Sequence, residues 1–208
     1  MYFSSQLIKE REQTQATCAH FENELDEAIC KKIIDYCKLN LTLEKGGIGE
    51  STGGSQAFTD LFVKSVRNID IGWIRPSEET NFLFKKIVEK TNQINNFFNF
   101  DIVGTTEPIQ FTSHDGNKDE HFDWHLDMGA VYKSRRKLSL IIQLSAETDY
   151  KGSELQIEVD ARDDKSVNGS TKTDSMIFFS SYLRHRVTPV TSGHRYFSAS
   201  WLPGNSCK

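Results

Sequence analysis

The chain has few of the residues or segments that mark secreted, membrane or nucleic-acid-binding proteins. Its 208 residues include four cysteines, and none of them forms a closely spaced metal-binding pair. No apolar run approaches the roughly 20 residues that a transmembrane helix needs. Basic residues do not outnumber acidic ones, and a net charge of −4 argues against electrostatic binding to nucleic acid. Residues 1–10 lack the basic end and apolar stretch of a signal peptide. These absences predict a cytoplasmic protein with no membrane or nucleic-acid partner.

The composition is that of a soluble globular protein. Apolar residues make up 37% of the chain, and 14 Phe supply bulky side chains for a core. The length suffices for one domain, so we expect a single domain over residues 1–208.

The sequence predicts that residues 1–100 form a helical support region with one strand. Helical spacing of apolar residues predicts a helix over residues 23–39 with Asn23 as its N-cap. Cys30 and Cys37 lie one heptad apart on it, which favours two core thiols over a disulfide. A strand is expected over residues 66–74, and a second helix from residues 76–79 to about Phe98.

Residues 46–55 are rich in glycine and could be mistaken for a phosphate-binding loop. No Lys-Ser or Lys-Thr follows them, and no strand-to-helix context surrounds them. We expect a loop bordering a functional site.

The residue pattern changes in residues 101–208, where short segments rich in β-branched and aromatic residues alternate with polar clusters. This pattern predicts an all-β sandwich or barrel half, with a surface loop over residues 160–172. The expected strands are residues 101–112, 121–128, 136–146, 153–159, 174–180, 184–190 and 194–202.

The most informative motif is His125-Leu126-Asp127, followed downstream by His185 and Arg195. Side chains alternate between the faces of a strand, so His125 and Asp127 would point the same way. With His185 from a distant strand they would form a 2-His-1-carboxylate set, which holds non-haem Fe(II) and leaves coordination positions open. Arg195 would then be placed to bind an anionic co-substrate.

Spacing alone leaves this site ambiguous. His121-Phe122-Asp123 has the same spacing as the motif, and strict alternation would put all four polar side chains on one face. That face would be solvated in an ordinary sandwich strand. His114 and His194 are also available as ligands on composition alone.

Residues 121–204 resemble the Fe(II)- and 2-oxoglutarate-dependent dioxygenases of the prolyl 4-hydroxylase-like group, especially the small bacterial and phage PKHD-type hydroxylases. The matching stretches keep the family's order and are Phe122–Asp127, Arg136–Ser139, Tyr150–Leu155 and His185–Tyr196. Weaker similarity reaches Ile109–Phe111 and Arg67–Ile69.

The resemblance implies a double-stranded β-helix (jelly roll) core over residues 101–208, buttressed by N-terminal helices. It implies that His125, Asp127 and His185 bind Fe(II) and that Arg195 pairs with the distal carboxylate of 2-oxoglutarate. It also implies O2 as a co-substrate and allows ascorbate as a reductant.

Two positions depart from the family pattern. The tyrosine usual in the strand before the His-x-Asp motif is absent, and His114 is expected to take its place at 2-oxoglutarate. The paired glycines usual before Glu-Leu appear as Gly152-Ser153. Neither departure removes an expected ligand.

The implied reaction is hydroxylation of a C–H bond coupled to decarboxylation of 2-oxoglutarate to succinate and CO2. Related halogenases lack the carboxylate ligand, so Asp127 favours hydroxylation. The substrate is expected to be a prolyl residue in a peptide or protein, with Trp124, Trp73, Tyr182 and residues 46–55 as candidates for lining its groove. A free amino acid or other small molecule is the alternative.

Two other classes of function stay open. One is a non-catalytic metal-binding jelly-roll module, which would not need to retain all four site residues. The other is a zinc hydrolase with the same three ligands, in which Asp123 would act as base and Arg195 would have no role. The sequence does not indicate the oligomeric state.

Overall fold

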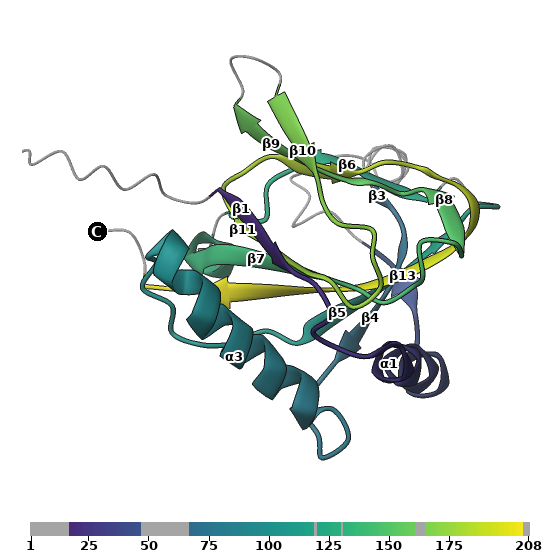
Figure 1. The fold of residues 1–208 in the computed structure, drawn as a ribbon, viewed down its shortest axis with the longest axis horizontal. Coiled ribbons are helices and arrows are strands. Elements are labelled where there is room, and N and C mark those ends of the chain that lie inside the picture. The colour runs from purple at the N-terminus through teal and green to yellow at the C-terminus, as the bar shows by residue number, and fades with distance from the viewer. Residues whose placement is uncertain (1–16, 47–66, 119, 130, 161–164, 206–208) are drawn as a thin grey trace, which may run out of the picture.

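Two antiparallel sheets lie face to face, and two helices cover the outer side of the larger sheet (Figure 1). The computed structural model describes residues 17–46, 67–118, 120–129, 131–160 and 165–205. The larger sheet has the order β1-β11-β7-β13-β5-β4-β2, with β8 paired to β13, and the smaller sheet has the order β10-β9-β12-β6-β3. This arrangement confirms a mainly β jelly roll with N-terminal helices.

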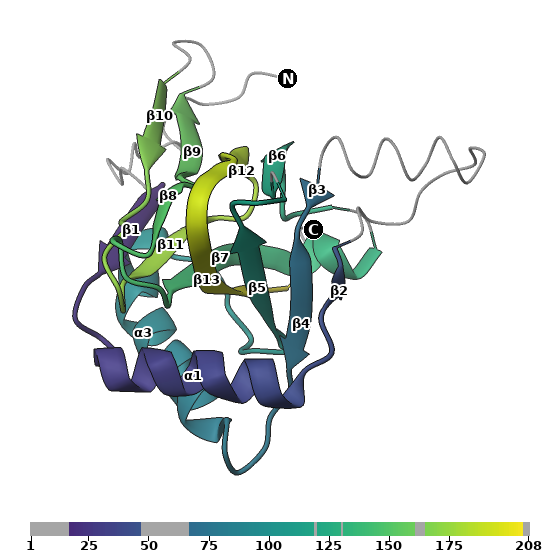
Figure 2. The same ribbon diagram turned by 90° about the vertical axis from the view of Figure 1, so that its right-hand side faces the viewer.

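The elements follow one another in the order that Figure 2 also shows, from the purple N-terminal end to the yellow C-terminal strand. Their bounds are β1 Cys18–Phe21, α1 Glu27–Asn40, β2 Glu44–Lys45, β3 Arg67–Asn68, β4 Asp70–Ile74, α3 Asn81–Phe98, β5 Ile109–Asp115, β6 His121–His125, the 3-10 helix η2 Val131–Arg135, β7 Arg136–Gln143, β8 Tyr150–Gly152, β9 Leu155–Asp160, β10 Lys165–Asn168, β11 Met176–Ser180, β12 His185–Val187 and β13 Val190–Pro203.

Helix α1 begins later than the sequence predicted. Its N-cap is Asp26, whose carboxylate accepts a hydrogen bond of 2.6 Å from the backbone N–H of Ile29. Asn23 is not the cap: it has a left-handed backbone (φ 58°), and its N–H donates to the side chain of Asp174. The expectation for Cys30 and Cys37 is confirmed, because both thiols are buried in the core and burial raises the pKa of each to about 12.

Helix α3 also begins later than expected, at Asn81 rather than within residues 76–79. The hydroxyl of Thr80 donates to the carbonyl of Arg75 and accepts from the backbone N–H of Ser77, which holds these residues in a turn. None of the helices in the described part of the chain is long and apolar enough to cross a membrane.

The larger sheet separates two hydrophobic cores because its side chains alternate between its faces. On β7, Leu138, Leu140 and Ile142 belong to the core shared with the helices. Ile141 belongs instead to the core between the sheets, where it is joined by Phe179 of β11. Side chains of β12 and of the C-terminal half of β13 also belong to this second core, which fills the space between the sheets.

Strands from residues before 101 complete both sheets, where the sequence predicted only one strand. β1, β2 and β4 belong to the larger sheet, and β3 forms an edge of the smaller one. The chain therefore passes from one sheet to the other between Asn68 and Asp70. These strands are too short to give a periodic signal, and the partner strands stabilise them.

Two strand predictions in residues 101–208 need correction. The strand expected over residues 101–112 begins only at Ile109, because Pro108 and the left-handed Gly104 interrupt the segment before it. The loop expected over residues 160–172 contains β10, which pairs with β9 in a hairpin. The other expected strands are present with shifted ends.

Candidate metal centre

Two neighbouring strands of the smaller sheet bring the site histidines together. His125 ends β6, His185 begins β12, and the two are paired directly across the strands. Their ring centroids lie 4.1 Å apart. Asp127 follows β6 by two residues and is 8% exposed. Residues 60 positions apart in sequence thus meet because their strands are neighbours.

A β-bulge in β6 changes which side chains face inward. His185 pairs with His125 and Val187 pairs with Phe122, so β6 has one more residue than β12 between these pairs. Phe122 therefore stacks on His125, with ring centroids 3.4 Å apart. The strict alternation expected over residues 121–128 is wrong, and the strand ends at His125 rather than at residue 128.

The bulge separates the two overlapping His-x-Asp motifs. The Asp123 side chain is exposed, and its carboxylate accepts from the backbone N–H of Trp124. Within the described residues, one cluster of His, Cys, Asp or Glu side chains has metal-binding geometry, and it consists of His125, Asp127 and His185. His194 instead bonds to Ser113 through Nε2, at 2.7 Å.

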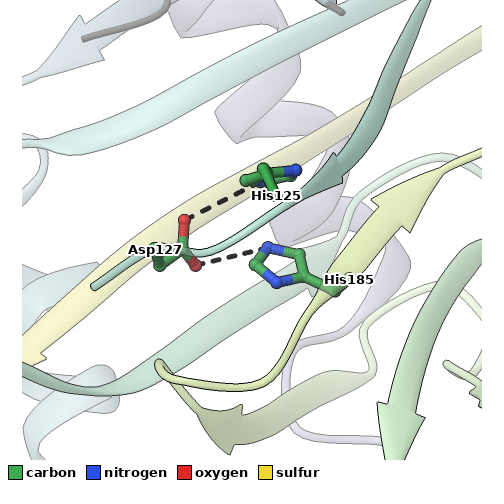
Figure 3. A group of neighbouring side chains, drawn as sticks. All are labelled: His125, Asp127 and His185. Atoms are coloured by element: carbon green, nitrogen blue, oxygen red, sulfur yellow. Dashed lines mark ion pairs between the residues drawn. The ribbon is translucent and has the colours of Figure 1, made fainter. Parts of the chain in front are cut away.

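The donor atoms of the cluster converge on one point (Figure 3). Nε2 of His125 lies 3.9 Å from Oδ1 of Asp127, and Nε2 of His185 lies 3.4 Å from Oδ2. All three ligand atoms lie within 4.8 Å of one another. Two imidazole nitrogens and one carboxylate oxygen, grouped on one side, form the donor set that non-haem Fe(II) takes, so these residues fit the metal.

Backbone carbonyls fix the tautomer of both histidines. Nδ1 of His125 donates to the carbonyl of Asp123 at 2.7 Å, and Nδ1 of His185 donates to the carbonyl of Leu183 at 3.0 Å. Each Nε2 is then left with a lone pair directed into the cluster. Burial, together with the charge of His185, lowers the pKa of His125 to about 3, so this imidazole is neutral and ready to bind a cation.

Asp127 is held as a carboxylate inside the protein. Burial alone would raise its pKa, but the two histidines and the hydroxyl of Ser139 outweigh this effect and lower the pKa. The hydroxyl of Ser139 on β7 donates to Oδ2 of Asp127 at 2.6 Å. The hydroxyl oxygen of Ser181 lies 2.9 Å from that of Ser139. Ser139 belongs to a stretch that resembles the family, but nothing in the sequence assigns it this contact.

Arg195 lies on β13, 2% exposed, facing the interior between the sheets. Phe197 and Trp201, which lie two and six residues further along β13, both belong to the inter-sheet core. Nε of Arg195 donates to Oε1 of Gln143 at 2.9 Å, and Nη1 donates to the carbonyl of Ser153 at 2.5 Å. Burial lowers its pKa, opposed only by Tyr150. No carboxylate of the described residues forms an ion pair with this buried guanidinium.

His114 lies directly across from Arg195, on β5. It is fully buried, and its Nδ1 lies 2.8 Å from the hydroxyl of Ser153. Burial and the charge of Arg195 hold its pKa well below the ordinary value of 6.5. The structure places His114 beside Arg195 and adds Ser153 to the group, and the expected contact of His114 with 2-oxoglutarate stays a prediction.

The residues expected to line a peptide groove lie in different places. Trp73 is 39% exposed, and its ring centroid lies 6.4 Å from that of Trp201 at the edge of the inter-sheet core. Trp124 instead contacts the guanidinium of Arg186, on the opposite face of the smaller sheet from His185. Tyr182 is 44% exposed. Residues 47–55 lie outside the described residues.

Sequence comparison with known proteins identifies the family to which this chain belongs. The sequence profile of the 2OG-Fe(II) oxygenase superfamily matches residues 109–203. A PKHD-type hydroxylase of Prochlorococcus marinus is 31% identical over 173 residues, which cover 79% of this chain and 70% of that protein. The chain belongs to the PKHD-type 2OG-Fe(II) oxygenases.

Other members of this oxygenase family match over a shorter stretch. A PKHD-type hydroxylase of Synechococcus is 34% identical over 83 residues, and one of Hyphomonas neptunium is 38% identical over 82 residues. These matches cover 40% and 38% of this chain, and about a third of each relative, 36% and 35%. The family takes its name from Fe(II) and 2-oxoglutarate, and the His-Asp-His cluster fits that metal.

Solved structures of oxygenases share the fold. A prolyl-4-hydroxylase from Pseudomonas putida superposes with a TM-score of 0.67 at 14% identity, covering 91% of this chain and 94% of its own. A prolyl hydroxylase from Trichoplax adhaerens, in complex with a peptide fragment of hypoxia inducible factor, superposes with a TM-score of 0.69 at 17% identity, covering 91% and 84%. The chain therefore shares its jelly-roll fold with these prolyl hydroxylases.

Proposed function

We propose that this protein is an Fe(II)- and 2-oxoglutarate-dependent hydroxylase that acts on a prolyl residue of a peptide or protein. Arg195 carries the proposal. A guanidinium buried without a carboxylate is unfavourable, because desolvation penalises a charge that has no partner. The distal carboxylate of 2-oxoglutarate supplies that partner.

His125, Asp127 and His185 would hold the metal through Nε2, a carboxylate oxygen and Nε2. A metal held by these three donors would keep coordination positions open for the co-substrate and O2. When bound, the iron and 2-oxoglutarate together activate O2, yielding succinate, CO2 and a hydroxylated substrate. The three metal ligands alone would suffice for a non-catalytic metal-binding module. Arg195 favours the oxygenase over that module, because its role is to bind an anionic co-substrate.

The protein's own residues set the geometry of the site. Carbonyls of Asp123 and Leu183 hold both imidazoles in the tautomer that presents Nε2, and Ser139 orients the carboxylate of Asp127. Arg195 would position 2-oxoglutarate with its planar fork. Apolar side chains of the inter-sheet core, such as Phe197 and Ile157, exclude water from the interior beside it.

The choice of a prolyl substrate rests on relatives and on one surface feature. The structures with the same fold include prolyl hydroxylases, and one of them is bound to a peptide. Trp73 offers an exposed aromatic face next to Trp201, and Trp201 pairs with Ser139 across the strands. An apolar ring on the substrate would pack there.

A substrate screen tests this proposal. The iron-loaded protein is incubated with 2-oxoglutarate, O2 and either a library of proline-containing peptides or the free amino acids. We expect products 16 Da heavier from peptides, dependent on 2-oxoglutarate and absent when alanine replaces the proline. Modification of free amino acids alone would replace the peptide proposal with the small-molecule one.

A further inference from the structure

Ser153 has a backbone conformation that L side chains rarely adopt. Its φ is +54°, in the left-handed region that favours glycine, and it is 1% exposed. Its hydroxyl nevertheless makes two buried contacts, at 2.8 Å to Nδ1 of His114 and at 3.3 Å to Nη1 of Arg195. A side chain at a strained position with two such contacts indicates that the hydroxyl has a role.

One arrangement of donors and acceptors satisfies the hydrogen bonds among Arg195, Ser153 and His114. Arg195 has donors only, so Ser153 Oγ accepts from Nη1. The single hydroxyl hydrogen of Ser153 is then available to Nδ1 of His114, which accepts it. Because burial keeps His114 neutral, the one ring proton is on Nε2.

Nε2 of His114 has no hydrogen-bond partner among the described residues, although it is completely buried. A buried donor without an acceptor is unfavourable, and native proteins rarely leave one. His114 pairs directly with Arg195 across β5 and β13, so this donor and the guanidinium occupy neighbouring positions on the inner face. One anionic ligand could accept hydrogen bonds from both the Nε2–H of His114 and the guanidinium of Arg195.

We infer that His114 is a co-substrate-positioning residue, that its Nε2–H donates to the distal carboxylate held by Arg195, and that Ser153 fixes the tautomer that makes this possible. The inference rests on the proposed function. It also links the two departures from the family pattern, because His114 and Ser153 touch each other. The strained serine is useful only together with the histidine.

A comparison of two ligands isolates the carboxylate contact. 2-Oxopentanoate has the same five-carbon chain as 2-oxoglutarate but ends in a methyl group. Dissociation constants for both are measured by calorimetry on the Mn(II)-loaded protein, for wild type, His114→Leu, His114→Gln and Ser153→Gly. Ser198→Ala is the matched control, since it removes a buried hydroxyl that has no hydrogen-bond partner in the described part of the chain.

We expect His114→Leu and Ser153→Gly to weaken 2-oxoglutarate binding about tenfold or more, the contribution of a hydrogen bond to a charged group. Binding of 2-oxopentanoate should stay as in wild type, and His114→Gln, which keeps an N–H donor, should retain most of the affinity for 2-oxoglutarate. Ser153→Gly should leave the melting temperature close to that of wild type, because relief of the left-handed strain offsets the loss of the two buried hydrogen bonds, and an unchanged melting temperature would show that weaker binding does not come from a damaged fold.

A second measurement reads the tautomer directly. Two-bond ¹H–¹⁵N spectra of the histidine-labelled, Zn(II)-loaded protein should show His114 protonated at Nε2, with that signal shifting when 2-oxoglutarate is added. Equal losses for both ligands, or a proton on Nδ1, would overturn the inference while leaving the proposed function intact. A wild type that does not bind 2-oxoglutarate would overturn the proposed function itself.

Discussion

The hydroxyl of Ser139 donates a hydrogen bond of 2.6 Å to Oδ2 of Asp127, joining a strand of the larger sheet to the metal cluster on the smaller one. Both residues are buried. The contact orients the carboxylate and stabilises its charge, and it ties the metal site to the sandwich core.

Ser139→Ala should therefore weaken metal binding. Partners that orient a metal ligand typically contribute 10–100-fold in affinity, so we expect a loss of about that size for Mn(II) measured by calorimetry. The control is Ser198→Ala, which also removes a buried serine hydroxyl from the larger sheet. Equal affinities for both variants would show that the contact does not orient the ligand.

The two overlapping His-x-Asp motifs predict opposite results for two aspartates. Asp127→Ala should abolish both metal binding and turnover, because it removes a donor atom from the cluster. Asp123→Ala should retain both, because this carboxylate is exposed, lies outside the cluster and accepts a hydrogen bond from the backbone N–H of Trp124. Metal content and succinate formation are the measurements, and the reverse pattern would move the site to His121 and Asp123.

The sequence predicted the three residues of the metal cluster through their resemblance to a family rather than through periodicity. His125, Asp127, His185 and Arg195 could be singled out because their order resembles one family. The choice between Asp123 and Asp127 depends physically on the bulge in β6, whose extra residue is defined by pairing with β12. Periodicity within one segment cannot foresee such a shift in register.

Other features depend on tertiary contacts that leave little trace in the sequence. Asn23 and Asp26 are both good N-caps, and the bond from Asn23 to the distant Asp174 decides between them. β1 and β3 are short, and they are strands only because β11 and β6 pair with them. The sequence assigns no contact to Ser139 or Ser153, and only the fold places them beside Asp127 and His114.

The buried His114 should make the apo protein sensitive to acid. Its folded pKa is well below the value of about 6.5 expected in the unfolded chain, so the unfolded state binds more protons as the pH falls. Its contribution to stability is complete above pH ~6.5 and decreases below it, by up to about 1.4 kcal/mol per pH unit. His114→Gln should flatten the dependence of unfolding free energy on pH between about 7 and 5. An unchanged slope would contradict the neutral, buried state.

Gly193 should tolerate no side chain, because of both its backbone and its surroundings. Its φ is +76°, and a Cβ would lie 2.0 Å from the carbonyl oxygen of Asp149. Gly193→Ala should therefore destabilise the fold by several kcal/mol and displace Arg195, two residues on. Gly104→Ala is the control, because φ there is +112° but nothing lies within 4 Å of the added Cβ. Similar melting temperatures for the two variants would show that strain alone matters.

The most direct test of the central claim is an anaerobic titration of the apo protein with Fe(II) and then 2-oxoglutarate, followed by admission of O2. We predict a weak visible charge-transfer band that appears only after 2-oxoglutarate is added, is absent in Asp127→Ala, and decays with formation of succinate once O2 enters. Absence of the band together with absence of succinate in the wild type would contradict the assignment as an Fe(II)- and 2-oxoglutarate-dependent oxygenase.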